Sequence, residues 1–155
     1  MEVLAELFYT INKADPRVGL VDYSPIPLDE DYGVDATGTN VNGDKVAVQV
    51  KYRGNPHDKA TYPTYAEIAR TFASGVCQCG IDPSKDSTIF VLTNADSLGS
   101  NCQKVLGNRL VATTRQTLKH FMDNNRTFWR TAAYAVLEYL QMHRKNKVIQ
   151  KGVYK

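Results

Sequence analysis

Residues 33–53 read GVDATGTNVNGDKVAVQVKYR, two β-prone segments that flank the dipeptide Asn42-Gly43. Asn-Gly is the dipeptide that most favours the left-handed backbone of a two-residue hairpin turn. We therefore expect a β-hairpin whose strands cover residues 33–41 and 45–53. The position of the turn decides which residues of the two strands face one another.

The second strand of this hairpin alternates valine with other residues. Successive strand residues point to opposite faces of a sheet. Val46, Val48 and Val50 therefore share one face, which we expect to belong to the core. Gln49 and Lys51 share the other face.

The segments on either side of the hairpin show helix and strand patterns in turn. From the hydrophobic periodicity we expect helices over 2–13, 64–79, 98–106, 116–122 and 127–142, and strands over 18–23, 88–93 and 109–112. This order predicts an α/β fold, a mixed β-sheet flanked by α-helices, with a further helix at the C-terminus.

The whole chain has the composition of one globular domain. Its 155 residues are 43% hydrophobic and 23% charged, which excludes a collagen-like or wholly disordered protein. We expect a single domain whose core covers about residues 1–122, followed by a C-terminal helix and basic tail over 126–155.

The sequence also predicts a cytoplasmic location. Three cysteines cannot all pair, so a reducing compartment is the simpler interpretation. No apolar run approaches the roughly 20 residues of a membrane span. The first residues, MEVLAE, lack the basic start and the long apolar stretch of a signal peptide. We therefore expect no association with a membrane.

The net charge of +3 hides an uneven distribution along the chain. Residues 1–35 hold eight acids and two bases, a net charge of −6, and residues 36–155 hold eight acids and 17 bases, a net charge of +9. An acidic segment ahead of a basic body fits a metal site that faces a polyanion, and it fits an ordinary solvated surface equally well. Charge alone does not choose between them.

The hairpin brings a carboxylate, an amide and an ammonium group toward one edge of the sheet. Asp35 lies on the first strand, and Gln49, Val50 and Lys51 lie on the second. Cleavage of a phosphodiester needs a divalent metal held by hard oxygen ligands and a cation near the attacking water. Asp35, Gln49 and the carbonyl of Val50 could bind the metal, and Lys51 could orient water or offset developing charge. The alternative is a hairpin with a simply polar outer face.

Two segments of this region resemble the PD-(D/E)XK restriction-endonuclease-like nucleases. Residues 31–36, DYGVDA, are similar to the family's (D/H)xG(I/V)D segment, and residues 46–53, VAVQVKYR, are similar to its Q(V/C)K strand. The QxK form is that of the Mrr-like branch. The resemblance implies a restriction-endonuclease-like core and DNA cleavage that depends on Mg²⁺, for which Mn²⁺ can substitute.

Carried over residue by residue, the resemblance implies that Asp35 and Gln49 bind metal and that Lys51 is catalytic. It also implies that Glu6, on the leading helix, is an additional ligand or water-positioning group. Two positions depart from the family's pattern, because Val34 replaces the proline of the motif's name and Gln49 replaces the second acid. The lost negative charge makes Glu6, or the acidic cluster of Asp29, Glu30 and Asp31 at the start of the motif, more important as compensation.

Basic and aromatic residues around the hairpin and near the C-terminus are candidates for contact with DNA. They are Tyr52, Arg53, Lys59, Arg70, Lys145 and Lys147. Such residues can track a phosphate backbone, although scattered bases are usually a solvated surface. We expect double-stranded or branched DNA as the partner.

We also expect a homodimer, because one site cuts one strand. The apolar stripe of the last helix is the expected interface.

The sequence therefore predicts a metal-dependent DNA endonuclease of the site-specific, homing, phage or mobile-element type. Two alternatives stay open within the same fold. One is a structure-specific Holliday-junction resolvase, and the other is a non-cleaving DNA-binding module or a subunit that works with a helicase or another nucleic-acid-processing partner. An interaction protein that binds no nucleic acid is a third class, which salt-sensitive DNA binding would exclude.

Overall fold

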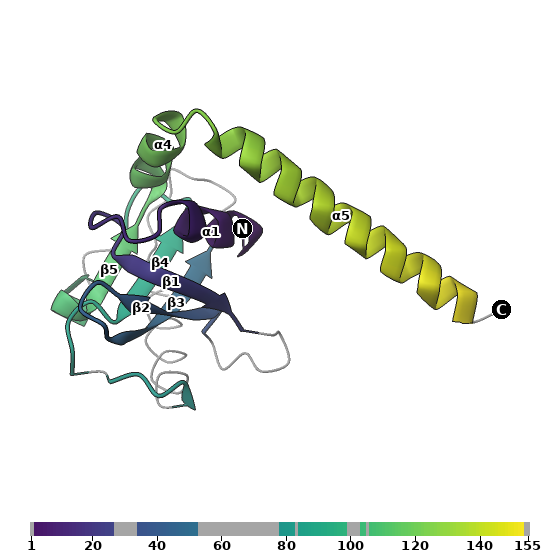
Figure 1. Ribbon diagram of the computed structural model, residues 1–155. Coiled ribbons are helices and arrows are strands. Elements are labelled where there is room, and N and C mark those ends of the chain that lie inside the picture. Colours follow the sequence, from purple (N-terminus) through teal and green to yellow (C-terminus); the bar gives the residue numbers. More distant parts are fainter. Residues whose placement is uncertain are drawn as a thin grey trace. The chain divides into compact units, whose positions relative to one another are not determined.

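The computed structural model describes residues 2–26, 34–52, 78–82, 84–98, 103–104 and 106–153. The chain divides into two compact units, residues 1–120 and 121–155. In the described part of the first unit, the strands form a sheet in chain order (Figure 1). They are β1 (Leu20–Pro25), β2 (Ala36–Asn40), β3 (Lys45–Lys51), β4 (Ile89–Thr93) and β5 (Leu110–Thr113).

The pairing of the strands changes from antiparallel to parallel at β3. β1, β2 and β3 pair antiparallel, whereas β3, β4 and β5 pair parallel. The α/β class predicted from the sequence is confirmed, because a mixed sheet is combined with helices. The strand order and directions are consistent with the restriction-endonuclease-like core that the resemblance implies.

β3 is buried on both of its faces. Every residue from Val46 to Val50 is at most 8% exposed. We expected only one face of β3 to belong to the core. The opposite face is also buried, because Ala47 packs in an apolar cluster with Ile89 of β4. A central strand between β2 and β4 is covered on both sides, which leaves Gln49 buried in an apolar neighbourhood.

The hairpin forms where the sequence predicts it, but its turn is longer than expected. The strands separate after the pair Thr39 and Lys45. The N–H of Gly43 donates to the carbonyl of Asn40 at 3.0 Å, and Gly43 has a φ of +85°. The loop is thus three residues with glycine in the left-handed position, and the prediction of a two-residue Asn42-Gly43 turn was wrong.

The side chain of Asn40 explains the longer turn. Its Oδ1 accepts from the backbone N–H groups of Asn42 and Asp44, at 2.9 and 3.0 Å. Its Nδ2 donates to the carbonyl of Ser87 at 2.9 Å, so this buried amide also ties the hairpin to the segment before β4. These side-chain hydrogen bonds stabilise the three-residue loop over a two-residue turn.

α1 (Glu2–Ile11) packs against β1 and confirms the leading helix. Phe8 and Tyr9 are buried, and the Tyr9 ring stacks on Tyr23 of β1 with 5.2 Å between the ring centroids. Burial raises the pKa of the Tyr9 phenol above its usual range, so this side chain is neutral at physiological pH.

The last part of the chain is helical. The short η2 (Gly107–Arg109) leads into β5, and α4 (Arg115–Asp123) and α5 (Phe128–Val153) follow. α5 continues beyond the predicted end at residue 142, because residues 143–151 contain no proline or glycine and are rich in helix-favouring Lys, Arg and Gln. Neither α5 nor any other helix in the described ranges is long and apolar enough to cross a membrane.

Two other predicted helices have different outcomes. The helix expected over 64–79 lies outside the described residues except at its end. The helix expected over 98–106 begins later than predicted, because Leu98 forms an extended bridge and is buried in the apolar cluster of the sheet. The described residues Gln103, Lys104 and Leu106 are helical.

Candidate active site

Asp35 lies where β2 begins, and backbone hydrogen bonds fix its position. Its N–H donates to the carbonyl of Val48 at 2.9 Å, and its carbonyl accepts from the N–H of Ile26 at 3.0 Å. The first pair of the ladder is Ala36 with Val48, and Asp35 is a bend residue directly before it. Asp35 therefore lies next to the part of β3 that runs from Val48 to Val50.

The carboxylate of Asp35 is bound to the backbone of β3. Its Oδ2 accepts from the N–H of Val50 at 2.7 Å, a short charge-assisted hydrogen bond. The N–H and the C=O of one strand residue point to the same edge of the strand. The carbonyl of Val50 therefore projects toward the Asp35 side as well, which brings two kinds of oxygen to one place.

Gln49 and Lys51 follow one another on a single face of β3. Gln49 is 4% exposed, and Lys51 is half-buried. On the parallel neighbour β4, Gln49 pairs with Val91 and Lys51 pairs with Thr93. Both strands end here, so the polar groups stand at the carboxyl ends of parallel strands, the edge where α/β sheets usually bind ligands.

The predicted catalytic residues divide into two groups. Gln49, Val50 and Lys51 follow one another on β3, and Asp35, directly before β2, is joined to them by its hydrogen bond with Val50, so the hairpin brings these four residues together as expected. Glu6 is exposed on α1, and no hydrogen bond or ion pair within the described ranges joins it to these residues. Its role as a ligand stays a prediction.

The predicted DNA contacts fall mostly outside the described part of the chain. Tyr52 is described, and its side chain is 66% exposed directly after Lys51. Arg53, Lys59 and Arg70 lie outside the described residues, as does the acidic cluster at the start of the motif. Lys145 and Lys147 lie on α5, where the backbone is described and their side chains are not.

The chemistry of the donors at Asp35 fits a hard divalent cation. Carboxylate, amide and backbone carbonyl oxygens are ligands of Mg²⁺, which binds one or two carboxylates and keeps several waters. Within the residues that the structure describes, no three His, Cys, Asp or Glu side chains gather in one place. Among the three candidate metal ligands, Asp35, Gln49 and the Val50 carbonyl, only Asp35 carries a negative charge.

A second polar group on the same sheet face was missed in the sequence. Thr37 and Thr39 alternate along β2, and their partners across the hairpin are Ala47 and Lys45. Thr37, Thr39 and Lys45 therefore lie on the face of the sheet that also carries Gln49. The signal was present as a polar residue at each odd position from 35 to 39.

Comparisons with known proteins give one similar structure. No protein-family model matches the chain, and no curated protein matches it. The chain is similar to the crystal structure of a repair endonuclease from Pyrococcus abyssi, with 18% sequence identity and a TM-score of 0.40. The similarity covers 71% of this chain and 45% of that chain, so this chain spans less than half of the solved structure. The case for an activity therefore rests on the residues of the site.

Proposed function

We propose that the chain is a Mg²⁺-dependent endodeoxyribonuclease of the QxK type of PD-(D/E)XK nuclease. The observation that supports this most is the 2.7 Å hydrogen bond between Val50 N–H and Asp35 Oδ2. It holds an acidic oxygen beside Gln49 and next to the strand that carries Lys51. A merely polar outer face would not require a carboxylate fixed to the backbone of the neighbouring strand.

Each residue of the site has a distinct role in this proposal. Asp35, Gln49 and the Val50 carbonyl would hold Mg²⁺ or Mn²⁺, which activates water and polarises the phosphate when bound. Lys51 stands about 7 Å along β3 from Gln49, on the same face. Its ammonium group would orient the attacking water and offset negative charge on the phosphate. Glu6 would contribute a second carboxylate.

Metal removal provides the direct test. Purified protein is incubated with supercoiled plasmid, linear duplex and a four-way junction, in Mg²⁺, in Mn²⁺ and in EDTA. We expect cleavage in both metals and none in EDTA, because the site has too little charge to activate water alone. Salt-sensitive binding without cleavage in any metal would contradict the proposal and favour the non-cleaving module.

The same assay separates the proposed endonuclease types. Cutting confined to the four-way junction would indicate a junction resolvase, and cutting of plasmid and linear duplex at fixed positions would indicate a site-specific enzyme. Cleavage that requires an added helicase would indicate a subunit of a larger machine. The proposed partner in each case is DNA, bound through its phosphates.

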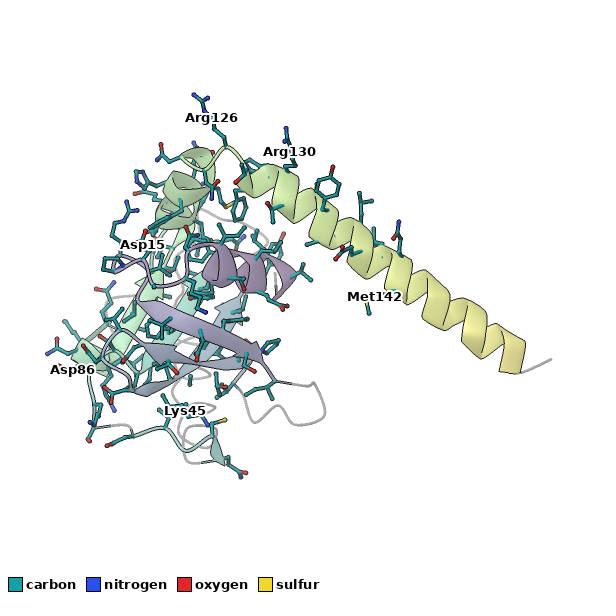
Figure 2. The ribbon with its side chains drawn as sticks, viewed as in Figure 1. Asp15, Lys45, Asp86, Arg126, Arg130 and Met142 are labelled. Carbon is teal, nitrogen blue, oxygen red and sulfur yellow. The ribbon has the colours of Figure 1, made fainter. Side chains whose placement is uncertain are left out.

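We further propose that two copies pair through α5. Apolar side chains in its first half share one side of the helix, at a spacing of four, seven, eight and eleven residues from the first. They are Trp129, Ala133, Val136, Leu137 and Leu140. The four larger ones are 44–57% exposed, whereas Phe128 and Ala132 on the adjacent side are buried. Exposed Met142 and the charged Arg130 project from the same helix (Figure 2).

A second copy suits this stripe because a helix with the same apolar spacing can cover it in a two-fold contact. Residues 143–153 hold four bases and no acid, so antiparallel pairing keeps the two basic ends apart. The stripe offers roughly 300–400 Å² per copy, taking about 150–250 Å² for a whole aromatic side chain. Two copies would together bury roughly 600–800 Å², which is below the roughly 1,200 Å² in total of a stable interface, so the dimer is expected to be weak without DNA.

Sedimentation velocity over a wide range of protein concentration tests the pairing. We expect a concentration-dependent dimer that DNA strengthens and that the double variant Leu137→Glu, Leu140→Glu abolishes. The matched control is Tyr134→Glu, at a side chain that is 65% exposed on another side of α5. A monomer under all conditions, or equal loss in both variants, would contradict pairing through the stripe.

A further inference from the structure

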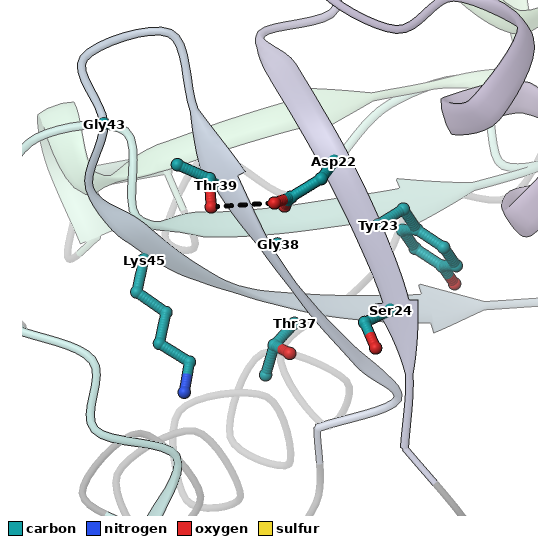
Figure 3. A pocket seen from close by; sticks show the side chains of 8 residues that line it. All are labelled: Asp22, Tyr23, Ser24, Thr37, Gly38, Thr39, Gly43 and Lys45. Atoms are coloured by element: carbon teal, nitrogen blue, oxygen red, sulfur yellow. Dashed lines mark hydrogen bonds between the residues drawn. The ribbon is translucent and has the colours of Figure 1, made fainter.

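A pocket of about 370 Å³ lies over β1, β2 and β3 (Figure 3). Its lining residues are Asp22, Tyr23, Ser24, Thr37, Gly38, Thr39, Gly43 and Lys45. The strand register arranges the polar ones in cross-strand rows. One row joins Asp22, Thr39 and Lys45, and the next joins Ser24 with Thr37.

The proposed metal site lies further along the hairpin, toward the end of β3. Lys45 is four residues from Gln49 on β3, and because this separation is even, both side chains belong to the face that also carries Thr37. Buried Ala47, the partner of Thr37, lies between them on this face. The pocket and Gln49 of the proposed metal site therefore share one face of the hairpin.

Gly38 keeps β1 and β2 close together at the pocket. A Cβ at this position would lie 2.5 Å from the carbonyl oxygen of Asp22, so no side chain fits. The register of β1 shifts between Leu20 and Asp22, which is where that carbonyl meets β2. The close approach sets Asp22 beside Thr39 at one end of the pocket.

The polar groups of the pocket balance in charge. Thr39 Oγ1 donates to Asp22 Oδ2 at 3.1 Å, and this pair marks one end (Figure 3). Lys45 is exposed on the other side of Thr39 and makes no ion pair within the described ranges. The hydroxyls of Ser24 and Thr37 lie in the neighbouring row. A ligand with one negative charge and a hydrogen-bond donor would match this site, because the charge would meet Lys45 and the donor would meet Asp22. A free dianion would leave one of its charges without a partner.

We propose that this pocket binds a nucleotide that flanks the cleaved bond, with its phosphate at Lys45 and a donor of its base or sugar at Asp22. The inference rests on the proposed nuclease function and extends it to the substrate strand. Lys45 and Gln49 lie about 13 Å apart along β3. A strand of duplex DNA advances about 3.4 Å per nucleotide along its axis, so the contacted phosphate lies within about four nucleotides of the cut.

Binding in EDTA tests the pocket without cleavage. Fluorescence anisotropy is measured for labelled duplex and single-stranded oligonucleotides with the unaltered protein, with Lys45→Gln and with the control Lys119→Gln, an exposed lysine on α4. We expect Lys45→Gln to weaken binding about fivefold and to lower the salt slope by about one. In cleavage assays with metal, this variant should raise KM and leave kcat unchanged.

A neutral methylphosphonate placed at single positions near the cut locates the contact. One position within about four nucleotides should weaken binding of the unaltered protein and have no further effect on Lys45→Gln. Inorganic phosphate and a free mononucleotide should not displace the oligonucleotide. Displacement by inorganic phosphate would identify a simple anion site and overturn the assignment, as would equal effects of Lys45→Gln and Lys119→Gln.

The outcomes separate this inference from the nuclease proposal. Cleavage with Lys45→Gln unchanged would overturn the pocket and leave the proposed activity intact. A selective binding loss in Lys45→Gln, in a protein that cuts no DNA in any metal, would overturn the nuclease, and with it the placing beside a cleaved bond, and would support only nucleotide binding in the pocket. A protein that binds no oligonucleotide would overturn both.

Discussion

Lys51→Ala is expected to slow DNA cleavage about a thousandfold and to change DNA affinity in EDTA much less. Lys51 is half-buried at the end of β3, two residues from Gln49 on the same face. In the proposed mechanism, an ammonium group there would stabilise charge that develops only as the phosphate is attacked. Its loss should therefore lower kcat and kcat/KM together and leave KM nearly unchanged. Single-turnover cleavage of a labelled duplex measures the effect.

The control for this experiment is Lys119→Ala, which removes an exposed lysine from α4. It should leave the cleavage rate unchanged, because Lys119 lies on neither strand of the site. Thermal unfolding checks that both variants remain folded. Cleavage by Lys51→Ala at a rate near that of the unaltered protein would remove Lys51 from the chemistry and contradict the proposed site.

Lys45 and Lys51 offer a contrast within one strand. They are six residues apart on the same face of β3, and one lies in the pocket while the other lies at the proposed metal site. We expect the pocket lysine to act on KM and the site lysine to act on kcat. If the two lysines acted only through a general positive charge, variants at Lys45 and Lys51 would change KM and kcat in the same way. A difference between the two variants therefore shows that the lysines have separate roles.

The sequence predicted the parts of the site that depend on local pattern. The hairpin, its strand alternation and the placing of Asp35 near Gln49 and Lys51 follow from a period of two and a turn signal. These features involve residues fewer than 20 positions apart. The structure adds one local detail that periodicity does not contain, namely that the Asp35 carboxylate binds the Val50 N–H.

The features that the sequence did not predict depend on distant segments. Asn40 reshapes the turn because its amide contacts the carbonyl of Ser87, 47 residues away. Gln49 is buried because β4 pairs in parallel with β3, a partner about 40 residues further along the chain. The pocket depends on the pairing of β1 with β2 and on its register shift. Such contacts are set by tertiary packing, which overrides local preference.

Asp35 should be the residue whose loss has two separable consequences. Asp35→Asn is expected to abolish cleavage while costing less than about 1 kcal/mol of stability, because the amide oxygen can still accept from Val50 N–H. Asp35→Ala should abolish cleavage too, and it should cost about 1–3 kcal/mol, because Val50 N–H loses its acceptor. Chemical denaturation and the plasmid assay measure the two effects.

Metal binding supplies the readout that a purely structural role would not change. Mg²⁺ or Mn²⁺ should raise the Tm of the unaltered protein, because a ligand that binds only the folded state stabilises it. Asp35→Asn should lose this metal-dependent shift although it remains folded. Asp86→Asn is the matched control, since Asp86 is an exposed carboxylate outside the site, and it should keep both the shift and the cleavage (Figure 2). If Asp35→Asn retained the metal response and cut DNA normally, Asp35 would serve only to join β2 to β3, and the metal site proposed here would be wrong.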